Sequence, residues 1–167
     1  MIQLTSRFVG QLDFGDDSVA GAVLPAGVHG FGAGAWYWIH GDETLTQSEL
    51  DRTEAALGDM AALVAEALVA FAAELSDSRS TTSSFREFHL EEVPEEMACD
   101  LFDVDTCEVV TDEVFLDHLV LVGIAINPSA KERVLALDFA IGADKPTDQL
   151  LVAVWDRNGT VTAHHES

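Results

Sequence analysis

The acidic stretch between residues 91 and 112 is the part of the sequence best supplied with groups that could do chemistry, because closely spaced carboxylates can bind calcium. An EF-hand loop needs acidic ligands at positions one, three and five, Gly at six and Glu at twelve. Counted from Asp103, positions five and six are Cys107 and Glu108, and counted from Asp100, position three is Phe102. Since neither register fits, the pattern predicts a solvated acidic face and no metal site.

Signatures of nucleophilic or metal-based catalysis are missing as well. No Ser lies in a Gly-x-Ser-x-Gly elbow, and neither Cys has a neighbouring His. No two histidines have the His-Glu-x-x-His or His-x3-His spacing of a zinc site. The histidines are His29, His40, His89, His118, His164 and His165. We therefore predict no catalytic residue, no cofactor and no metal ligand, and we keep a hydrolase with an unrecognised site as an alternative.

An aromatic run, Trp36-Tyr37-Trp38, lies near the end of an expected strand over residues 28–40. Aromatic side chains supply large, stiff contact areas, so this run could line a ligand-binding face. Strand alternation instead predicts one face in the core, with Trp36 and Trp38 on one side and Tyr37 and Ile39 on the other.

The net charge of the chain excludes some classes of binding partner. The chain carries 30 Asp and Glu against 8 Lys and Arg, a net charge of −22, yet 48% of its residues are hydrophobic. This combination is typical of a folded domain with an acidic surface. Such a surface repels nucleic acids and anionic membranes, which are bound through Lys and Arg. It attracts basic proteins, and it equally suits a housekeeping protein of a salt-adapted cytoplasm; composition leaves both explanations open.

Uncompensated negative charge is concentrated in one segment. No Lys or Arg occurs between Arg86 and Lys131, while 12 Asp and Glu occur from Glu87 to Ala130. Self-repulsion in such a segment costs folding free energy, which a cationic partner would relieve. We therefore predict that this segment binds a basic protein. The eight candidate binding residues are Glu91, Glu92, Glu95, Glu96, Asp100, Asp103, Asp105 and Glu108.

The clearest predicted element is an amphipathic helix over residues 47–75. Thr46, followed three residues later by Glu49, forms a capping-box pattern at its start. Gly58 lies inside the helix, where it costs about 1 kcal/mol relative to Ala, and it indicates a close packing contact. Apolar residues then recur every seven positions, as on one helix face. These residues are Leu50, Leu57, Val64 and Phe71.

Strand patterns flank this helix, and the whole chain is predicted to be a single α+β domain over residues 1–167. An N-terminal antiparallel β-meander precedes the helix, and a C-terminal antiparallel β-meander packs on it. Asn158-Gly159 predicts a tight hairpin between the last two strands. The predicted strands cover residues 8–14, 19–24 and 28–40 before the helix, and 119–126, 133–141, 150–155 and 160–163 after it.

The stretch between the helix and the C-terminal strands is harder to assign. Residues 76–84 are rich in Ser and Thr, which predicts a loop. Pro94 and Thr111 are positioned to begin two short helices. The acidic segment over residues 85–112 is otherwise expected to be irregular.

Location and redox state follow from simple features. The N-terminus lacks a basic segment followed by an apolar one, so no signal peptide is expected. The apolar stretch at residues 61–73 is interrupted by Glu66 and is too short to span a bilayer. We therefore predict a soluble, cytoplasmic protein that does not bind membranes. Cys99 and Cys107 lack the spacing of a disulfide framework, which predicts two reduced thiols.

The C-terminal third resembles an uncharacterised family of small acidic bacterial proteins, the DUF2004 type. The resemblance rests on Leu137–Gly142, Thr147–Val154 and Asp156–Val161, and Phe8–Phe14 and the helix fit the same outline. The family carries no established activity. Relatives of such proteins occur among the immunity proteins of bacterial toxin systems, so the resemblance implies a non-catalytic inhibitor of a basic protein.

Overall fold

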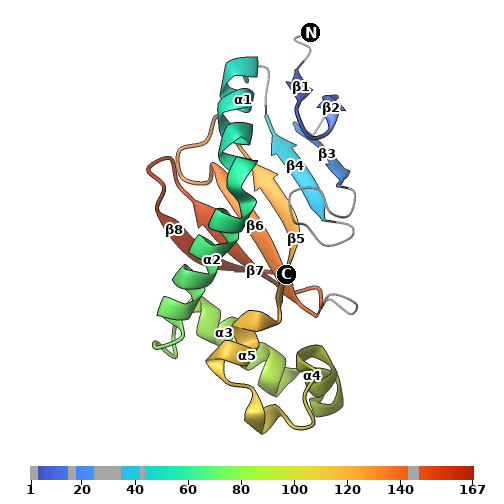
Figure 1. Cartoon of the computed structure of the whole chain (residues 1–167), viewed down its shortest axis with the longest axis vertical. Helices are drawn as coiled ribbons and strands as arrows, with labels where there is room; N and C mark the ends of the chain where they lie inside the picture. The colour runs from blue at the N-terminus through green and yellow to red at the C-terminus, as the bar shows by residue number, and fades with distance from the viewer. Residues whose placement is uncertain (1–3, 15–17, 25–34, 42–43, 143–146) are drawn as a thin grey trace.

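The centre of the molecule is a six-stranded sheet with the strand order β3-β4-β5-β6-β7-β8 (Figure 1). The structure, a computed structural model, describes residues 4–14, 18–24, 35–41, 44–142 and 147–167. Neighbouring strands are antiparallel except β4 and β5, which are parallel because the helices connect them. The strands are β3 (Val19–Val23), β4 (Trp36–His40), β5 (Leu119–Ile126), β6 (Leu135–Ile141), β7 (Leu150–Trp155) and β8 (Val161–Glu166).

The predicted C-terminal meander is confirmed. Strands β5 to β8 pair in sequence order, each antiparallel to the next. Asn158 and Gly159 form the hairpin turn between β7 and β8, with Gly159 at a φ of 83°. Its backbone N–H donates to the Asp156 carbonyl at 3.1 Å, which closes the turn.

The N-terminal strands divide between two sheets. Strands β3 and β4 join the large sheet, whereas β1 (Thr5–Ser6) and β2 (Gly10–Gln11) form a two-stranded sheet of their own. The strand predicted over residues 8–14 is therefore shorter than expected, because the Ser6 hydroxyl accepts the backbone N–H groups of Phe8 and Val9 and turns the chain there. Residues 28–34 of the predicted strand 28–40 lie outside the described residues.

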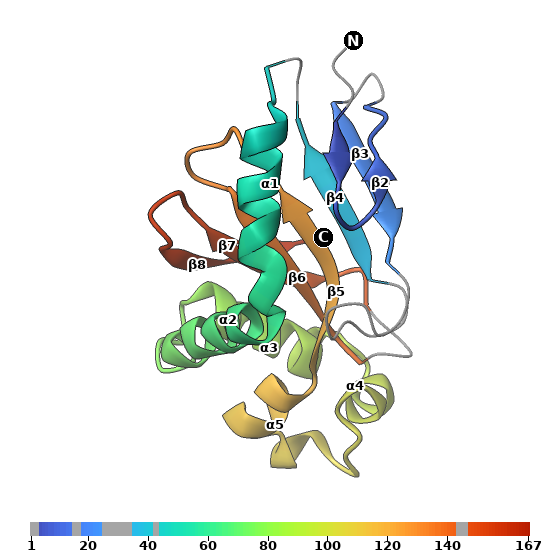
Figure 2. The same ribbon diagram turned by 45° about the horizontal axis from the view of Figure 1, so that its top comes forward.

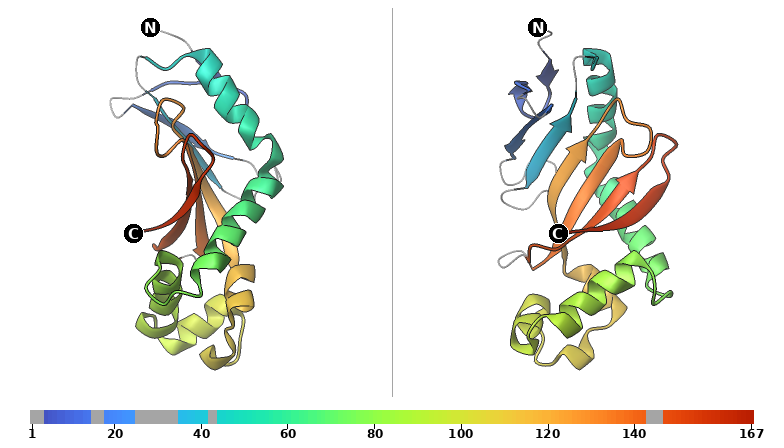
Figure 3. Two further views of the ribbon diagram at one scale, coloured as in Figure 1. Left: turned by 90° about the vertical axis from the view of Figure 1, so that its left-hand side faces the viewer. Right: turned by 180° about the vertical axis from the view of Figure 1, so that it is seen from behind.

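One long helix crosses a single face of the sheet (Figures 2 and 3). It comprises α1 (Gln47–Ala56), the 3₁₀ turn η2 (Leu57–Asp59) and α2 (Met60–Glu74). The capping box at Thr46 is present, and Leu57 and Phe71 of the predicted stripe are buried against the sheet. The close contact predicted at Gly58 is wrong, since a Cβ there would meet no atom within 4 Å. The helix is interrupted because the Asp59 side chain accepts the Ala62 N–H and caps α2.

The stretch Gln47–Glu74 is also the one helix among the described residues that has the length and composition of a membrane span. It has 28 residues, and its most apolar window has a mean hydropathy of 1.8, with 22% of that window buried. A helix that contributes to a protein core passes the same test, and Leu50, Leu57 and Phe71 are each at most 2% exposed. The cytoplasmic location of the chain stays a prediction.

Residues 80–118 form a cluster of short helices beside one end of the sheet, the helical lobe (Figure 1). The predicted loop over residues 76–84 is wrong from Ser80 onward, because the Ser80 hydroxyl accepts the Ser83 N–H at 3.1 Å and begins a helix. The helices expected after Pro94 and Thr111 are confirmed. The lobe contains α3 (Thr81–Glu87), the π-helical turn η3 (Phe88–Glu92), α4 (Glu95–Phe102), the 3₁₀ turn η4 (Cys107–Val109) and α5 (Asp112–Asp117).

Most of the segment expected to be irregular, residues 85–112, is thus helical. Phe85 and Phe102 are 0% exposed, as is Phe115 in α5. These rings pack into the same core as the sheet. Widely spaced aromatic residues give no clear helical period, so their common burial could not be seen in the sequence.

Candidate functional site

The eight predicted binding residues all lie on the helical lobe, and all eight are exposed. Two of them, Glu95 and Glu96, form the first turn of α4, where the helix dipole favours negative charge. The eight are Glu91 and Glu92 in η3, Glu95, Glu96 and Asp100 in α4, Asp103 and Asp105 in the turn after it, and Glu108 in η4. The structure therefore brings the predicted residues together on adjoining short helices.

The lobe contains a single Lys or Arg, namely Arg86. Its guanidinium donates to the Val110 carbonyl at 2.7 Å and lies 3.2 Å from the Asp112 carboxylate. Both partners belong to the lobe, and Asp112 is not among the eight. Arg86 thus connects α3 with α5 and with the turn before α5. Its positive charge is paired with the Asp112 carboxylate.

Two large apolar side chains are exposed on the same lobe. Met97 in α4 is 50% exposed and Val109 in η4 is 53% exposed. Glu96 precedes Met97 and Glu108 precedes Val109 along the chain. A surface of flexible apolar groups set among charges is suited to binding a protein, because the apolar groups supply contact area and the charges supply orientation.

The two cysteines also meet in the lobe. The Cys99 and Cys107 sulfur atoms are 3.5 Å apart, and both residues are free thiols. Burial, the neighbouring Cys99 thiol and the Glu95 charge raise the pKa of the Cys107 thiol to about 11. Because the thiolate is the reactive form, Cys107 is a weak nucleophile at neutral pH.

A second group of polar residues lies on the sheet face opposite the long helix. The left panel of Figure 3 shows the helix on one side of the sheet and the C-terminus of the chain on the other. This open face contains a hollow of about 500 Å³, which we call the sheet hollow. It is lined by Trp38, His40, Ala125, Ile126, Asn127, Arg133, Asp138, Leu150 and Glu166.

Asp138, in the middle of β6, is the most unusual of these residues. It is only 7% exposed, and its Oδ1 atom has no hydrogen-bond partner among the described residues. Burial and the Glu166 charge raise the pKa of the Asp138 carboxyl to about 6, while the Arg133 charge opposes them. A buried carboxyl without a partner costs free energy, so its retention points to a ligand or a titration role.

Gly123 makes room for this carboxyl. A Cβ at that position would lie 2.6 Å from the Asp138 Oδ2 atom and 2.9 Å from the Trp38 ring. The pairing of β5 with β6 also shifts register between Leu121 and Gly123. The missing side chain in β5 thus lets Asp138 and Trp38 approach each other across the strand.

The other titratable groups of the sheet hollow are an ion pair and a neutral imidazole. Arg133 and Glu166 form an ion pair at 2.6 Å. Partial desolvation and the Arg133 charge lower the pKa of His40 below 6.5, so its imidazole is neutral at pH 7. Asp138 is left as the charged group of the hollow without a partner.

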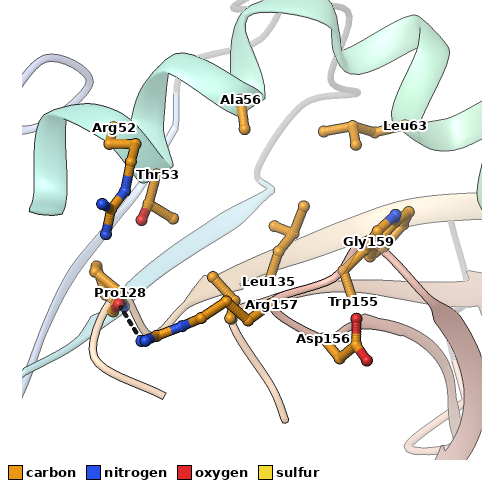
Figure 4. Close-up of a pocket in the computed structure, with 11 residues that line it drawn as sticks. Arg52, Thr53, Ala56, Leu63, Pro128, Leu135, Trp155, Asp156, Arg157 and Gly159 are labelled. Carbon is orange, nitrogen blue, oxygen red and sulfur yellow. Dashed lines mark hydrogen bonds between the residues drawn. The ribbon is translucent and has the colours of Figure 1, made fainter. Parts of the chain in front are cut away.

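A different pocket, of about 460 Å³, lies between α1 and the loops at one end of the sheet (Figure 4). Its walls include Leu63 and Trp155, and two guanidinium groups, Arg52 and Arg157, stand at its edge. Arg157 donates to the carbonyls of residues 128–130, the shortest bond being 2.8 Å to Ala130. Arg157 lies in the turn between β7 and β8, so these bonds tie that turn to the connection between β5 and β6.

The part of the chain that the structure describes holds no cluster of metal ligands. Within those residues, no group of three His, Cys, Asp or Glu side chains could hold a metal ion. Comparison of the chain with models of protein families, with curated proteins and with solved structures finds no match. The DUF2004 resemblance therefore stays a prediction.

Sequence reasoning missed the sheet hollow, although one signal was available. The strand Leu135–Ile141 holds a single charged residue, Asp138, in an otherwise apolar run. Charged residues are seldom fully buried without a partner, so one in the middle of an apolar strand marks a site to examine. The residues that surround Asp138 come from β4, β5 and β8, and no local pattern indicates that they meet.

Proposed function

We propose that this protein is a non-catalytic binding protein whose helical lobe engages the basic surface of another protein, as an immunity protein does. The observation that carries the proposal is which side chains of the lobe are exposed. Eight exposed carboxylates gather on the lobe with the exposed Met97 and Val109, and the one guanidinium of the lobe is bound to Asp112.

The expected partner follows from this surface. It presents Lys or Arg side chains around an apolar patch, because Met97 and Val109 need apolar contacts and the carboxylates need cations. Opposite charges steer such an encounter, so association is fast at low salt and slows as ionic strength rises. The distance over which exposed charges act falls to about 8–10 Å in physiological buffer.

The test compares two matched sets of four substitutions. The lobe set changes Glu91, Glu92, Glu95 and Glu96 to Gln. The control set changes four exposed acids outside the lobe to their amides, namely Asp51, Asp77, Glu132 and Asp148. Each set removes four negative charges, so the two proteins have the same net charge, and the control set also removes the Asp77 partner of Arg79, 3.7 Å away.

The unmodified protein is first used to capture partners from a lysate of the native host, and each captured protein is purified. Association rates with all three forms are then measured by surface plasmon resonance over a range of salt concentrations. We expect the lobe set to slow association about tenfold or more at low salt and to flatten its salt dependence, while the control set changes the rate little.

Two results would contradict the proposal. One is equal slowing by both sets, which would show that the total charge acts and not the lobe. The other is that the unmodified protein captures no basic partner, which would favour a salt-adapted surface.

A further inference from the structure

We propose that the sheet hollow binds an organic cation, with its ammonium or guanidinium group against Asp138 and the Trp38 ring and its carbon chain against the apolar part of the wall. This site lies on the open face of the sheet, and none of the eight acidic residues of the helical lobe lines it. The inference is therefore independent of the function proposed for the lobe.

The first support is the unpaired carboxyl. Asp138 is 93% buried, given its 7% exposure, it lines the hollow, and its Oδ1 atom has no partner among the described residues. The charge of this carboxylate is therefore poorly compensated within the protein, and a cation in the hollow beside it would compensate that charge. A cation that donates hydrogen bonds would do so best, because bonds between ionised groups are shorter and stronger than neutral ones.

The second support is the charge balance of the hollow. Glu166 is neutralised by Arg133 at 2.6 Å, and His40 on β4 is neutral at pH 7. Asp138 on β6 is mostly ionised at that pH, because its pKa is about 6. The hollow thus carries an excess negative charge, which an anion or a second carboxylate would increase and a single cation would cancel.

The third support is the aromatic wall. The Trp36 and Trp38 rings stack with centroids 5.6 Å apart and planes 9° from parallel. Trp38 lines the hollow and approaches Asp138 over Gly123. The negative face of an indole ring attracts ammonium and guanidinium groups, so the ring and the carboxylate favour the same class of ligand.

The size and walls of the hollow indicate an organic cation rather than a metal ion. About 500 Å³ is within the range of small-molecule sites, and Ala125, Ile126 and Leu150 make part of the wall apolar. Calcium needs six to eight oxygen ligands, whereas the side chains of the hollow offer the Asp138 carboxylate, the Asn127 amide oxygen and a Glu166 already held by Arg133.

The test uses simple probes at about pH 8, where Asp138 is ionised. n-Butylammonium and n-butylguanidinium are titrated into the full-length protein by calorimetry, and tryptophan fluorescence is followed in parallel. n-Butanol serves as the neutral probe of the same shape. We expect both cations to bind at least tenfold more tightly than the alcohol and to change the fluorescence. An alcohol that binds as tightly as the cations would overturn the proposal.

Substitutions in the hollow test whether the cation binds at Asp138 and Trp38. Asp138→Asn removes the charge and keeps the shape, and we expect it to weaken cation binding about tenfold or more. Trp38→Leu should weaken binding as well, while Glu132→Gln, an exposed neighbour outside the hollow, should leave it unchanged. Thermal unfolding of each variant shows that it is folded. Unchanged affinity in Asp138→Asn would place the cation elsewhere.

A final experiment tests whether the bound cation is an Arg side chain of a protein or a free small molecule. A capped Gly-Arg-Gly peptide carries the guanidinium as a protein side chain would. Tighter binding of the peptide than of n-butylguanidinium indicates a partner's Arg, and tighter binding of the free cation indicates a metabolite. If neither of them binds, the hollow does not bind organic cations.

Discussion

Two buried carboxyl groups, Glu54 and Asp138, differ in how fully their oxygen atoms are bonded. Glu54 in α1 is 0% exposed and accepts hydrogen bonds from the Ser6 hydroxyl, the Arg7 N–H and the Tyr37 hydroxyl. These bonds tie the N-terminal β1–β2 sheet, the long helix and β4 together. Burial and the Glu54 charge also raise the pKa of Tyr37, so its hydroxyl remains a donor. In Asp138, by contrast, the Oδ1 atom has no hydrogen-bond partner among the described residues. Glu54 is therefore a structural carboxyl, whereas Asp138 is a candidate for binding a ligand.

The stability of the protein should depend on pH through Asp138. The pKa of Asp138 is raised from 3.8 to about 6, so the folded protein holds this proton more tightly than the unfolded chain. Stability from this group is present below about pH 4, and it is lost as pH rises to about 6. Two pKa units correspond to about 3 kcal/mol, an upper value for the cost of ionising the buried group.

Asp138→Asn removes that cost, so the variant should be more stable than the unmodified protein at about pH 8, by about 1–3 kcal/mol. The difference should shrink toward zero as the pH falls below 3.8, where Asp138 is protonated in both the folded and the unfolded state. Urea unfolding midpoints across this pH range measure the effect, with Glu132→Gln as the control. A variant less stable than the parent at pH 8 would show that Asp138 has a structural bond.

At the scale of elements, the long helix joins the two halves of the structure. Its inner face packs on the sheet, where the Phe71 ring meets the Phe139 ring of β6 edge-on at 5.5 Å. Its C-terminal end continues into the helical lobe, since Glu74 accepts the Thr82 N–H and hydroxyl. The position of the lobe therefore depends on the helix being packed correctly on the sheet.

Two truncations on this helix should differ in cost. Leu57 is 2% exposed, so Leu57→Ala should lower the free energy of unfolding by about 2–5 kcal/mol. Val64 is only partly buried, so Val64→Ala should cost about 1 kcal/mol. Guanidinium unfolding at constant pH measures both. Ala61→Gly, on the exposed side, serves as a control for helix propensity alone, and midpoints unchanged in both truncations would show that this face is not core.

At the scale of the whole molecule, negative charge is unevenly placed along the chain. The segment from Glu87 to Ala130 holds 12 of the 30 acidic residues and no Lys or Arg. In contrast, Arg52, Arg133 and Arg157 belong to the helix start and to the loops of the sheet. Like charges on the helical lobe repel one another, and this repulsion lowers the stability of the fold.

Added salt should therefore stabilise the protein. Raising NaCl from about 0.05 M to about 0.5 M screens the repulsion, and the thermal midpoint should rise. At low salt, the lobe set of four Gln substitutions should raise the midpoint more than the matched control set, because it removes charge where no cation offsets it. Scanning calorimetry measures the three proteins. Equal midpoints for the two sets would mean that repulsion is spread evenly over the surface.

Local patterns in the sequence were enough to predict several elements correctly. The capping box at Thr46 and Glu49, the stripe through Leu57 and Phe71, and the turn at Asn158-Gly159 depend on residues close together in the chain. The alternation of Trp36 to Ile39 also held, since Tyr37 and Ile39 are 0% exposed. These features are set by backbone periodicity and by capping, which neighbouring residues determine.

The remaining features depend on contacts between residues that lie far apart in the sequence. Asp138 is buried without a partner because β5 lacks a side chain at Gly123 and Trp38 of β4 covers the strand; these residues are far apart in sequence. The helical lobe forms because Phe85, Phe102 and Phe115 share one core. Their spacing in the sequence follows no helical period, so it does not predict this shared burial. Charge could be counted from the sequence, but whether a carboxylate is exposed on the lobe or buried in the sheet depends on long-range packing.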